Sequence, residues 1–220
     1  MMDTRIVQID PKHVVTESIE KIIETLQGGG IIGYPTETVY GLGGDAMNEQ
    51  VVEQIYQLKG REVRYPFPLL IDQREDVYLL TRSISPRAET LMTRFWPGPL
   101  TLVFDASPSL PQVLTGKECK VGLRISSDPI CRAILKRYHK LLISTSANLS
   151  GEKPAQSASQ VLKYFRDQVN LIVDGGERRS GVPSTVVDVS GTCLRIIREG
   201  MITKDEIEKV IGFINESENN

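Results

Sequence analysis

The amino-acid sequence predicts an α/β protein in which helices flank an open, twisted mixed sheet. Short apolar runs alternate along the chain with longer segments whose apolar residues recur at helical spacing. Glycine, proline or a polar cap residue marks most boundaries between these segments. The 220 residues, 40% of them apolar, are enough to bury a core, and they contain no internal repeat.

Six helices are predicted from cap residues that precede an apolar helical face. The first has its apolar residues between Ile19 and Leu26 on one face and ends at the glycines 28–30. The third and fourth begin with a polar residue and a proline, the order that helix N-termini favour. The last two carry the capping-box pattern. In chain order, the caps are Thr16, Asn48, Ser85, Asp128, Ser157 and Thr203.

Eight strands are predicted from short apolar runs that are bounded by proline, glycine or polar loops. We expect them to form one sheet in a single domain covering residues 1–215, followed by a frayed polar tail at 216–220. The predicted strands cover residues 31–34, 68–72, 100–104, 121–125, 141–144, 171–173, 185–189 and 194–197.

Composition excludes several classes of protein. A net charge of −2 argues against a surface built to coat nucleic acid, although a local basic cleft remains compatible with it. The first eleven residues lack the apolar run of a signal peptide, and no stretch approaches the length of a membrane span. Cys119, Cys131 and Cys193 include no CxxC pair, so neither a disulfide framework nor a zinc site is predicted. A reduced, cytoplasmic protein is expected.

Several familiar catalytic motifs are absent. The sequence has no Walker-type phosphate loop, no GxGxxG after a strand and no GxSxG elbow. Its two histidines, His13 and His139, stand outside any polar cluster. Chemistry therefore has to rest on Lys, Arg, Ser, Thr and Asn, which suit the binding of phosphates better than proton abstraction.

Two candidate binding segments lie in the first third of the chain. The loop 34–45 leaves a buried strand with two hydroxyl groups, a carboxylate and several glycines, at an edge where α/β sheets bind ligands. The alternative is a long loop whose Thr and Glu cap the next helix. Lys59 and Arg61 end a predicted helix, where they would face a polyphosphate or simply interact with the helix dipole.

Further candidates lie in the second half. Arg124 stands in an apolar strand, where a charge is costly unless paired, so it needs a carboxylate from the protein or from a ligand. The loop 144–151 offers hydroxyls and an amide to phosphate or a hydrated metal ion, although such polar turns are common. Ser184 enters a strand from a loop, and Arg198 at the end of the last strand would pair with Asp188 or with a ligand.

Six motifs in this order resemble the YrdC-like family of L-threonylcarbamoyladenylate synthases. The resemblance runs from about residue 29 to 212, and the motifs together are far more specific than any one alone. They are PTETVYGLG at 35–43, KGR at 59–61, FWPGPLT at 95–101, VGLR at 121–124, STSANLSG at 144–151, and STVVD at 184–188 with REG at 198–200.

The resemblance implies a YrdC-like fold, with the sheet around a large, positively lined cavity, and a tetrad from the family's KxR and SxN elements. Mg²⁺ would accompany ATP, with no residue directly assigned to it. By the resemblance, the catalytic tetrad would be Lys59, Arg61, Ser146 and Asn148; L-threonine would be held by Thr36, Arg124, Ser144 and Ser184; and ATP by the tetrad together with Arg198.

The resemblance also implies a nucleotidyltransferase. Threonine and bicarbonate would combine to N-carboxy-threonine, whose carboxylate attacks the α-phosphate of ATP and expels pyrophosphate. The attacking group is already an anion, so positioning and charge neutralisation suffice. The threonylcarbamoyl-AMP would pass to a transferase complex that modifies tRNA. The chain departs from many relatives at Glu62, Tyr65 and Leu70, and it is expected to lack the C-terminal domain of longer relatives.

Two alternatives remain open. One is an RNA-binding or ribosome-maturation factor whose basic cavity binds tRNA or double-stranded RNA, against which net acidity and the lack of RGG-like segments weigh. The other is carbamoyl transfer from carbamoyl phosphate. Relatives that perform it carry zinc-finger-like and acylphosphatase domains, and this chain has neither the cysteines nor the length for them.

Overall fold

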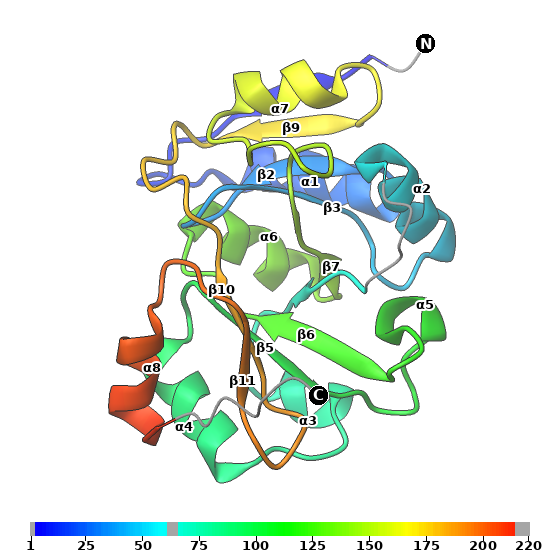
Figure 1. Cartoon of the computed structure of the whole chain (residues 1–220). Helices are drawn as coiled ribbons and strands as arrows, with labels where there is room; N and C mark the ends of the chain where they lie inside the picture. Colours follow the sequence, from blue (N-terminus) through cyan, green and yellow to red (C-terminus); the bar gives the residue numbers. More distant parts are fainter. Residues whose placement is uncertain (1–2, 61–65, 214–220) are drawn as a thin grey trace.

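The computed structural model describes residues 3–60 and 66–213, and its strands divide between two mixed sheets. Figure 1 shows these sheets one above the other, with helices above, below and at the height between them. The helices are α1 Thr16–Gln27, α2 Glu49–Lys59, α3 Asp76–Leu80, α4 Pro86–Phe95, α5 Gln112–Thr115, α6 Pro129–Tyr138, α7 Ala158–Phe165 and α8 Lys204–Ile211.

The first sheet has the strand order β1-β9-β2-β3-β8, and the second has the order β11-β10-β5-β6-β4-β7. Both combine parallel and antiparallel neighbours, because consecutive strands are joined both by hairpins and by helical crossovers. The strands are β1 Arg5–Gln8, β2 Ile32–Pro35, β3 Tyr40–Gly43, β4 Leu69–Leu70, β5 Leu100–Asp105, β6 Lys120–Arg124, β7 Leu142–Ile143, β8 Thr145–Ser146, β9 Leu171–Asp174, β10 Thr185–Asp188 and β11 Arg195–Arg198.

The mixed α/β class predicted from the sequence is confirmed, but the expectation of one sheet is wrong. The chain passes from the first sheet to the second between β3 and β4, and it returns to the first at Ser144, which separates β7 from β8. It crosses back through residues 175–184, which connect β9 to β10. Strand pairing depends on contacts between distant segments, so the local patterns that identify strands do not say which sheet each one joins.

Capping explains where most helices begin. Asn48 and Asp128 each accept two backbone N–H groups of the following turn, and Ser85 accepts one. Thr203 forms the complete capping box with Glu206. All four predicted caps are confirmed.

One predicted cap is wrong, and one predicted capping box is incomplete. Thr16 is already helical, and the N-cap is Val15, whose extended backbone lacks a side-chain cap. Ser157 caps α7 through the N–H of Gln160, but the Gln160 side chain accepts from Gln156, so only half of a capping box forms.

Two apolar clusters hold the layers together. One packs α1 and α6 against the first sheet, through residues such as Ile22, Ile134 and Leu171. The larger cluster fills the space around the second sheet and extends to α2 and α7. Burial of these side chains leaves the strand ends between the two sheets as the place where polar groups gather. No helix in the described part of the chain is long and apolar enough to cross a membrane.

Candidate functional site

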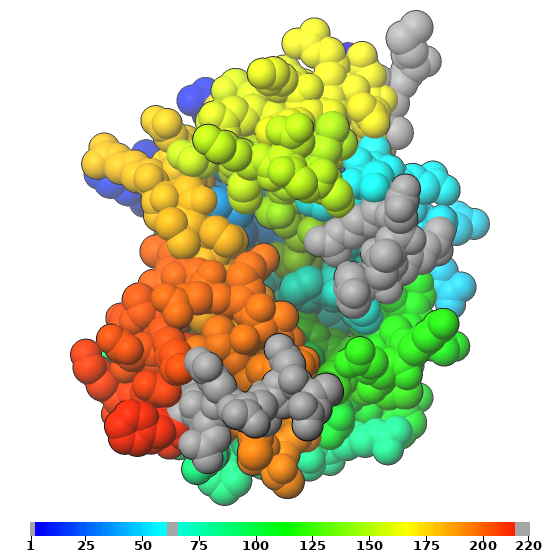
Figure 2. All heavy atoms as spheres, viewed as in Figure 1, coloured from blue at the N-terminus to red at the C-terminus, as the bar shows by residue number. Residues whose placement is uncertain are grey.

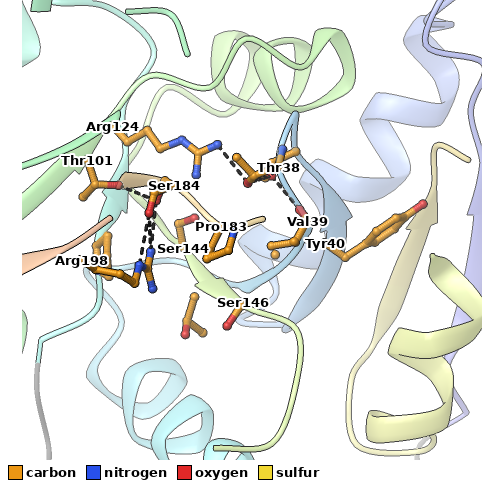
Figure 3. Close-up of a pocket in the computed structure, with 14 residues that line it drawn as sticks. Thr38, Val39, Tyr40, Thr101, Arg124, Ser144, Ser146, Pro183, Ser184 and Arg198 are labelled. Atoms are coloured by element: carbon orange, nitrogen blue, oxygen red, sulfur yellow. Dashed lines mark hydrogen bonds between the residues drawn. The ribbon is translucent and has the colours of Figure 1, made fainter. Parts of the chain in front are cut away.

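A pocket of about 100 Å³ lies between the two sheets. Figure 2 shows a recess between the segments of the upper and lower sheets, and Figure 3 shows the residues around the pocket. The volume is about seven to ten water-sized positions, enough for a small amino acid. The lining residues are Thr36, Thr38, Val39, Tyr40, Gly41, Pro68, Thr101, Arg124, Ser144, Thr145, Ser146, Pro183, Ser184 and Arg198.

The lining combines two arginines with seven hydroxyl-bearing Ser and Thr residues and includes no acidic residue. Two of the points where the chain changes sheets contribute to it, through Ser144 and through Pro183 and Ser184. A pocket with two guanidinium groups and no acidic lining residue favours an anionic ligand.

Arg124 lies at the end of β6 and is 5% exposed. Its Nη2 lies 2.8 Å from Oε1 of Glu37 and donates to Oγ1 of Thr38, while its Nε donates to the carbonyl of Gly98. The protein itself therefore supplies the carboxylate that a buried arginine requires. Nη1 makes no hydrogen bond to any described residue, which leaves one edge of the guanidinium for a ligand.

Electrostatics keep Glu37 ionised. Burial works to raise its pKa, but the charge of Arg124 and the hydrogen bonds donated by Ser126 and Arg124 outweigh it and lower the pKa below the ordinary value. The Glu37–Arg124 pair is thus charged on both sides at neutral pH.

The hydroxyl of Thr36 is engaged within its own loop. Its Oγ1 donates to the carbonyl of Val39 at 2.6 Å and lies 2.8 Å from Oγ1 of Thr38. The backbone N–H of Thr38 also donates to Thr36. These bonds form a compact hydroxyl turn that presents Thr38 to Arg124.

Ser184 lies at the centre of a second polar cluster. Its Oγ is 3.0 Å from Oγ1 of Thr101 on β5, and Nη2 of Arg198 donates to it from β11. Arg198 also donates twice to the Ser184 carbonyl. Asp188 instead pairs with Lys120 at 2.9 Å. Arg198 therefore does not pair with Asp188, which was one of its two predicted partners.

Lys59 and Asn148 lie next to the pocket, on the far side of Ser146. Nζ of Lys59 donates to the carbonyl of Ser146 at 2.6 Å and to Oδ1 of Asn148 at 3.3 Å, and Lys59 is only 2% exposed. The Asn148 amide donates to the carbonyls of Leu149 and Glu152, which closes the 144–151 loop. Arg61, the remaining member of the predicted tetrad, lies outside the described residues, as do Glu62 and Tyr65.

The structure therefore brings most of the predicted residues together. Thr36, Arg124, Ser144, Ser146, Ser184 and Arg198 all line one pocket. Sequence reasoning missed Glu37, Thr38 and Thr101 as individual site residues. Glu37 and Thr38 stand in the loop that was singled out, and the need of Arg124 for a carboxylate was a usable signal for Glu37. Thr101 ends the FWPGPLT motif at 95–101, but no role was assigned to it there.

Among residues 3–60 and 66–213, no three His, Cys, Asp or Glu side chains gather as metal ligands. The oxygen donors near Lys59 are the Asn148 amide and backbone carbonyls, including that of Ser146. Mg²⁺ commonly retains several water ligands and binds through substrate phosphates. This donor set fits only a Mg²⁺ ion that is bound to the protein through ATP.

Comparisons with known proteins identify the family to which the chain is similar. A model of the Sua5/YciO/YrdC family, described as "Telomere recombination", matches residues 24–200. The threonylcarbamoyl-AMP synthases of Pyrococcus abyssi and Bacillus subtilis are 39% and 38% identical to the chain, over 86% of its length in each case. The chain spans about half the length of these two relatives, 56% and 55%. A Coxiella burnetii protein of the same name is 34% identical, with 82% of this chain and 98% of the relative covered.

Solved structures show the same fold. P. abyssi Sua5 in complex with L-threonine matches 96% of this chain and 62% of its own, with a TM-score of 0.92 and 36% identity. Escherichia coli YciO matches 91% of this chain and 97% of its own, with a TM-score of 0.82 and 26% identity.

Proposed function

The chain belongs to the Sua5/YciO/YrdC family, and from this premise we propose that it makes threonylcarbamoyl-AMP and pyrophosphate from L-threonine, bicarbonate and ATP. The observation that carries the proposal is the free Nη1 edge of Arg124 in a hydroxyl-rich pocket without acidic lining residues. A relative with 36% identity was crystallised with L-threonine, which supports an amino acid as the occupant.

In this proposal Arg124 binds the threonine carboxylate. Glu37 and Thr38 hold its Nη2, so Nη1 is the donor that reaches the ligand. Ser144 and Ser184 supply hydroxyls to the remaining polar groups of the amino acid from two of the crossings between the sheets. Thr36 acts through its turn, because its own hydroxyl is already bonded within the loop.

The reaction then needs positioning more than a base. The threonine nitrogen bonds to the carbon of bicarbonate with loss of water, and a carbamate oxygen bonds to the α-phosphorus of ATP. The bond from that phosphorus to the bridging oxygen breaks, and pyrophosphate leaves with the electron pair. Lys59, Arg61 and Arg198 would neutralise the phosphates, with Ser146 and Asn148 beside them.

The pocket volume fits threonine and leaves no space for a whole nucleotide, so ATP would extend from its mouth toward Ser146. Mg²⁺ bound to the phosphates would screen their charge and favour pyrophosphate as the leaving group. Lys59 is buried behind the Ser146 carbonyl, and its contribution would be to hold the 144–151 loop as well as to attract phosphate. The product would be passed on to a transferase that modifies tRNA.

The test is pyrophosphate release from ATP, Mg²⁺ and bicarbonate with and without L-threonine, with mass-spectrometric detection of threonylcarbamoyl-AMP. Release that requires both threonine and bicarbonate is expected. At a threonine concentration near the wild-type KM, the Arg124→Ala variant should release much less pyrophosphate, whereas Arg87→Ala, which removes an exposed arginine of α4, should behave as the wild type. Turnover that ignores threonine would contradict the proposal, and salt-sensitive RNA binding without turnover would favour an RNA-binding factor.

A further inference from the structure

The segment 175–184 has no regular secondary structure, and its last two residues form part of one wall of the pocket. It connects β9 in the first sheet to β10 in the second, and its last residues, Pro183 and Ser184, line the pocket. A ten-residue connection of this kind needs side-chain contacts to hold its shape, because no strand partner fixes it.

Arg178 supplies those contacts. Its side chain is only 13% exposed, and Nη1 donates to Oδ2 of Asp128 at 2.7 Å. Nη2 donates to the carbonyl of Gly175, and the guanidinium carbon lies 5.8 Å from the centre of the Tyr40 ring. A Cβ atom on Gly175 would lie 2.8 Å from Pro35, so only glycine permits this close approach.

The arginine also reaches the opposite wall. Nη1 lies 3.4 Å from the carbonyl of Thr36, and the nearby Ser180 hydroxyl donates to the carbonyl of Thr38 at 3.0 Å. Thr38 in turn accepts from Nη2 of Arg124 inside the pocket. One side of the 36–38 turn thus meets the 175–184 segment, and its other side meets the predicted carboxylate-binding arginine.

Asp128 anchors the arrangement in the helical layer. Its Oδ1 accepts the N–H groups of Ile130 and Cys131 and caps α6, while its Oδ2 pairs with Arg178. Nε of Arg178 is buried and has no hydrogen-bond partner in the part of the chain that the structure describes. A buried N–H without a partner is unfavourable, and the other contacts of this guanidinium, which lies between the two walls, compensate for it.

We propose that Arg178, held by Asp128, is a positioning residue that sets the distance between the two walls of the amino-acid pocket. The proposal rests on the proposed function for its substrate. Arg178 does not line the pocket, so it acts through Thr36 and Thr38 on one side and through the 175–184 segment on the other. Its loss lets the walls move apart and removes the alignment of the amino-acid contacts.

The experiment compares the full chain with Arg178→Gln, Arg178→Lys and Asp128→Asn. Each protein is measured for the KM of L-threonine, the KM of ATP, and calorimetric binding of L-threonine alone. Arg178→Gln should raise the threonine KM about tenfold or more and leave the ATP KM within about twofold. Arg178→Lys retains one contact to Asp128 and should lie between the wild type and Arg178→Gln.

Asp128→Asn is the matched test of the mechanism. Asparagine is as good an N-cap as aspartate, so α6 is retained while the ion pair to Arg178 is lost. It should reproduce the effect of Arg178→Gln, and the double variant should add little. Arg179→Gln, which changes the exposed neighbouring arginine, should behave as the wild type.

Several outcomes overturn the proposal. A wild-type threonine affinity in folded Arg178→Gln or Arg178→Lys does so, as does strict additivity of the Arg178→Gln and Asp128→Asn effects. Equal changes in both KM values would also contradict it, because the proposed function assigns the 36–38 turn and the 175–184 segment to the amino acid. Failure of the proposed function is distinguishable, because it would be seen in the wild type as pyrophosphate release indifferent to threonine.

Discussion

Glu37 and Arg124 come from segments 87 residues apart and form a buried ion pair, with 2.8 Å between Oε1 and Nη2. The pair directs the guanidinium so that Nη1 is left for a ligand, and it neutralises the arginine when no ligand is bound. A buried arginine without a partner would be strongly unfavourable. The same geometry therefore serves both folding and the proposed binding of threonine.

Removal of Arg124 should act on threonine far more than on ATP. We expect Arg124→Ala to raise the threonine KM roughly 10- to 100-fold, the worth of a charge-assisted pair of hydrogen bonds to a carboxylate. Steady-state pyrophosphate release at varied threonine and varied ATP measures it. Equal effects on both substrates would argue against a carboxylate clamp.

Acid should unfold the wild type more steeply than a Glu37→Gln variant. Despite burial, Arg124 and Ser126 lower the pKa of Glu37. Its charge therefore contributes stability above the unfolded pKa of about 4.3, and that contribution is lost as the pH falls through the lower folded pKa. Urea unfolding at about pH 6, 5, 4 and 3.5 measures the difference. Parallel curves for the two proteins would show that Glu37 carries no such linkage.

Lys59→Ala should lower the rate of pyrophosphate release about 100-fold or more, because a buried cation and a loop contact are lost together. The unsatisfied Ser146 carbonyl should also cost about 1–3 kcal/mol of unfolding free energy. Lys163→Ala, at an exposed lysine on α7, is the matched control and should change neither quantity. Normal turnover by Lys59→Ala would exclude the predicted role.

Thr101→Val tests the hydroxyl cluster with little change of shape. Thr101 is buried on β5 and its hydroxyl lies 3.0 Å from that of Ser184. Loss of one neutral hydrogen bond should raise the threonine KM about two- to tenfold and leave the fold intact. Circular dichroism checks the fold, and an unchanged threonine KM in the folded variant would place Thr101 outside the binding network.

Gly43→Ala should destabilise the protein by about 1–3 kcal/mol or more, because a Cβ atom there would lie 2.0 Å from the carbonyl oxygen of Ile143. That carbonyl belongs to β7, next to the crossing at Ser144. Gly191→Ala is the control, since its nearest atom would be at 3.7 Å. Chemical denaturation compares the two, and equal stability of both variants would contradict the close approach.

Several helices, the family and the need of Arg124 for a carboxylate could be predicted from the sequence alone. Caps such as Asn48, Asp128 and Thr203, and the apolar face between Ile19 and Leu26, identify helices because these signals act within a few residues of chain. The motif order indicated the family, and the charge of Arg124 in an apolar strand predicted a carboxylate partner from the protein or from a ligand.

Tertiary structure alone decided how these parts meet. The division into two sheets, the approach of Glu37 to Arg124, and the contact of Arg178 with Asp128 and Thr36 all join segments that are far apart in sequence. Such contacts arise from packing of the whole chain, because local periodicity limits which face a residue occupies but not which distant residue it faces. For the same reason the contact of Thr101 could not be predicted from the sequence, since only the fold places its hydroxyl against Ser184.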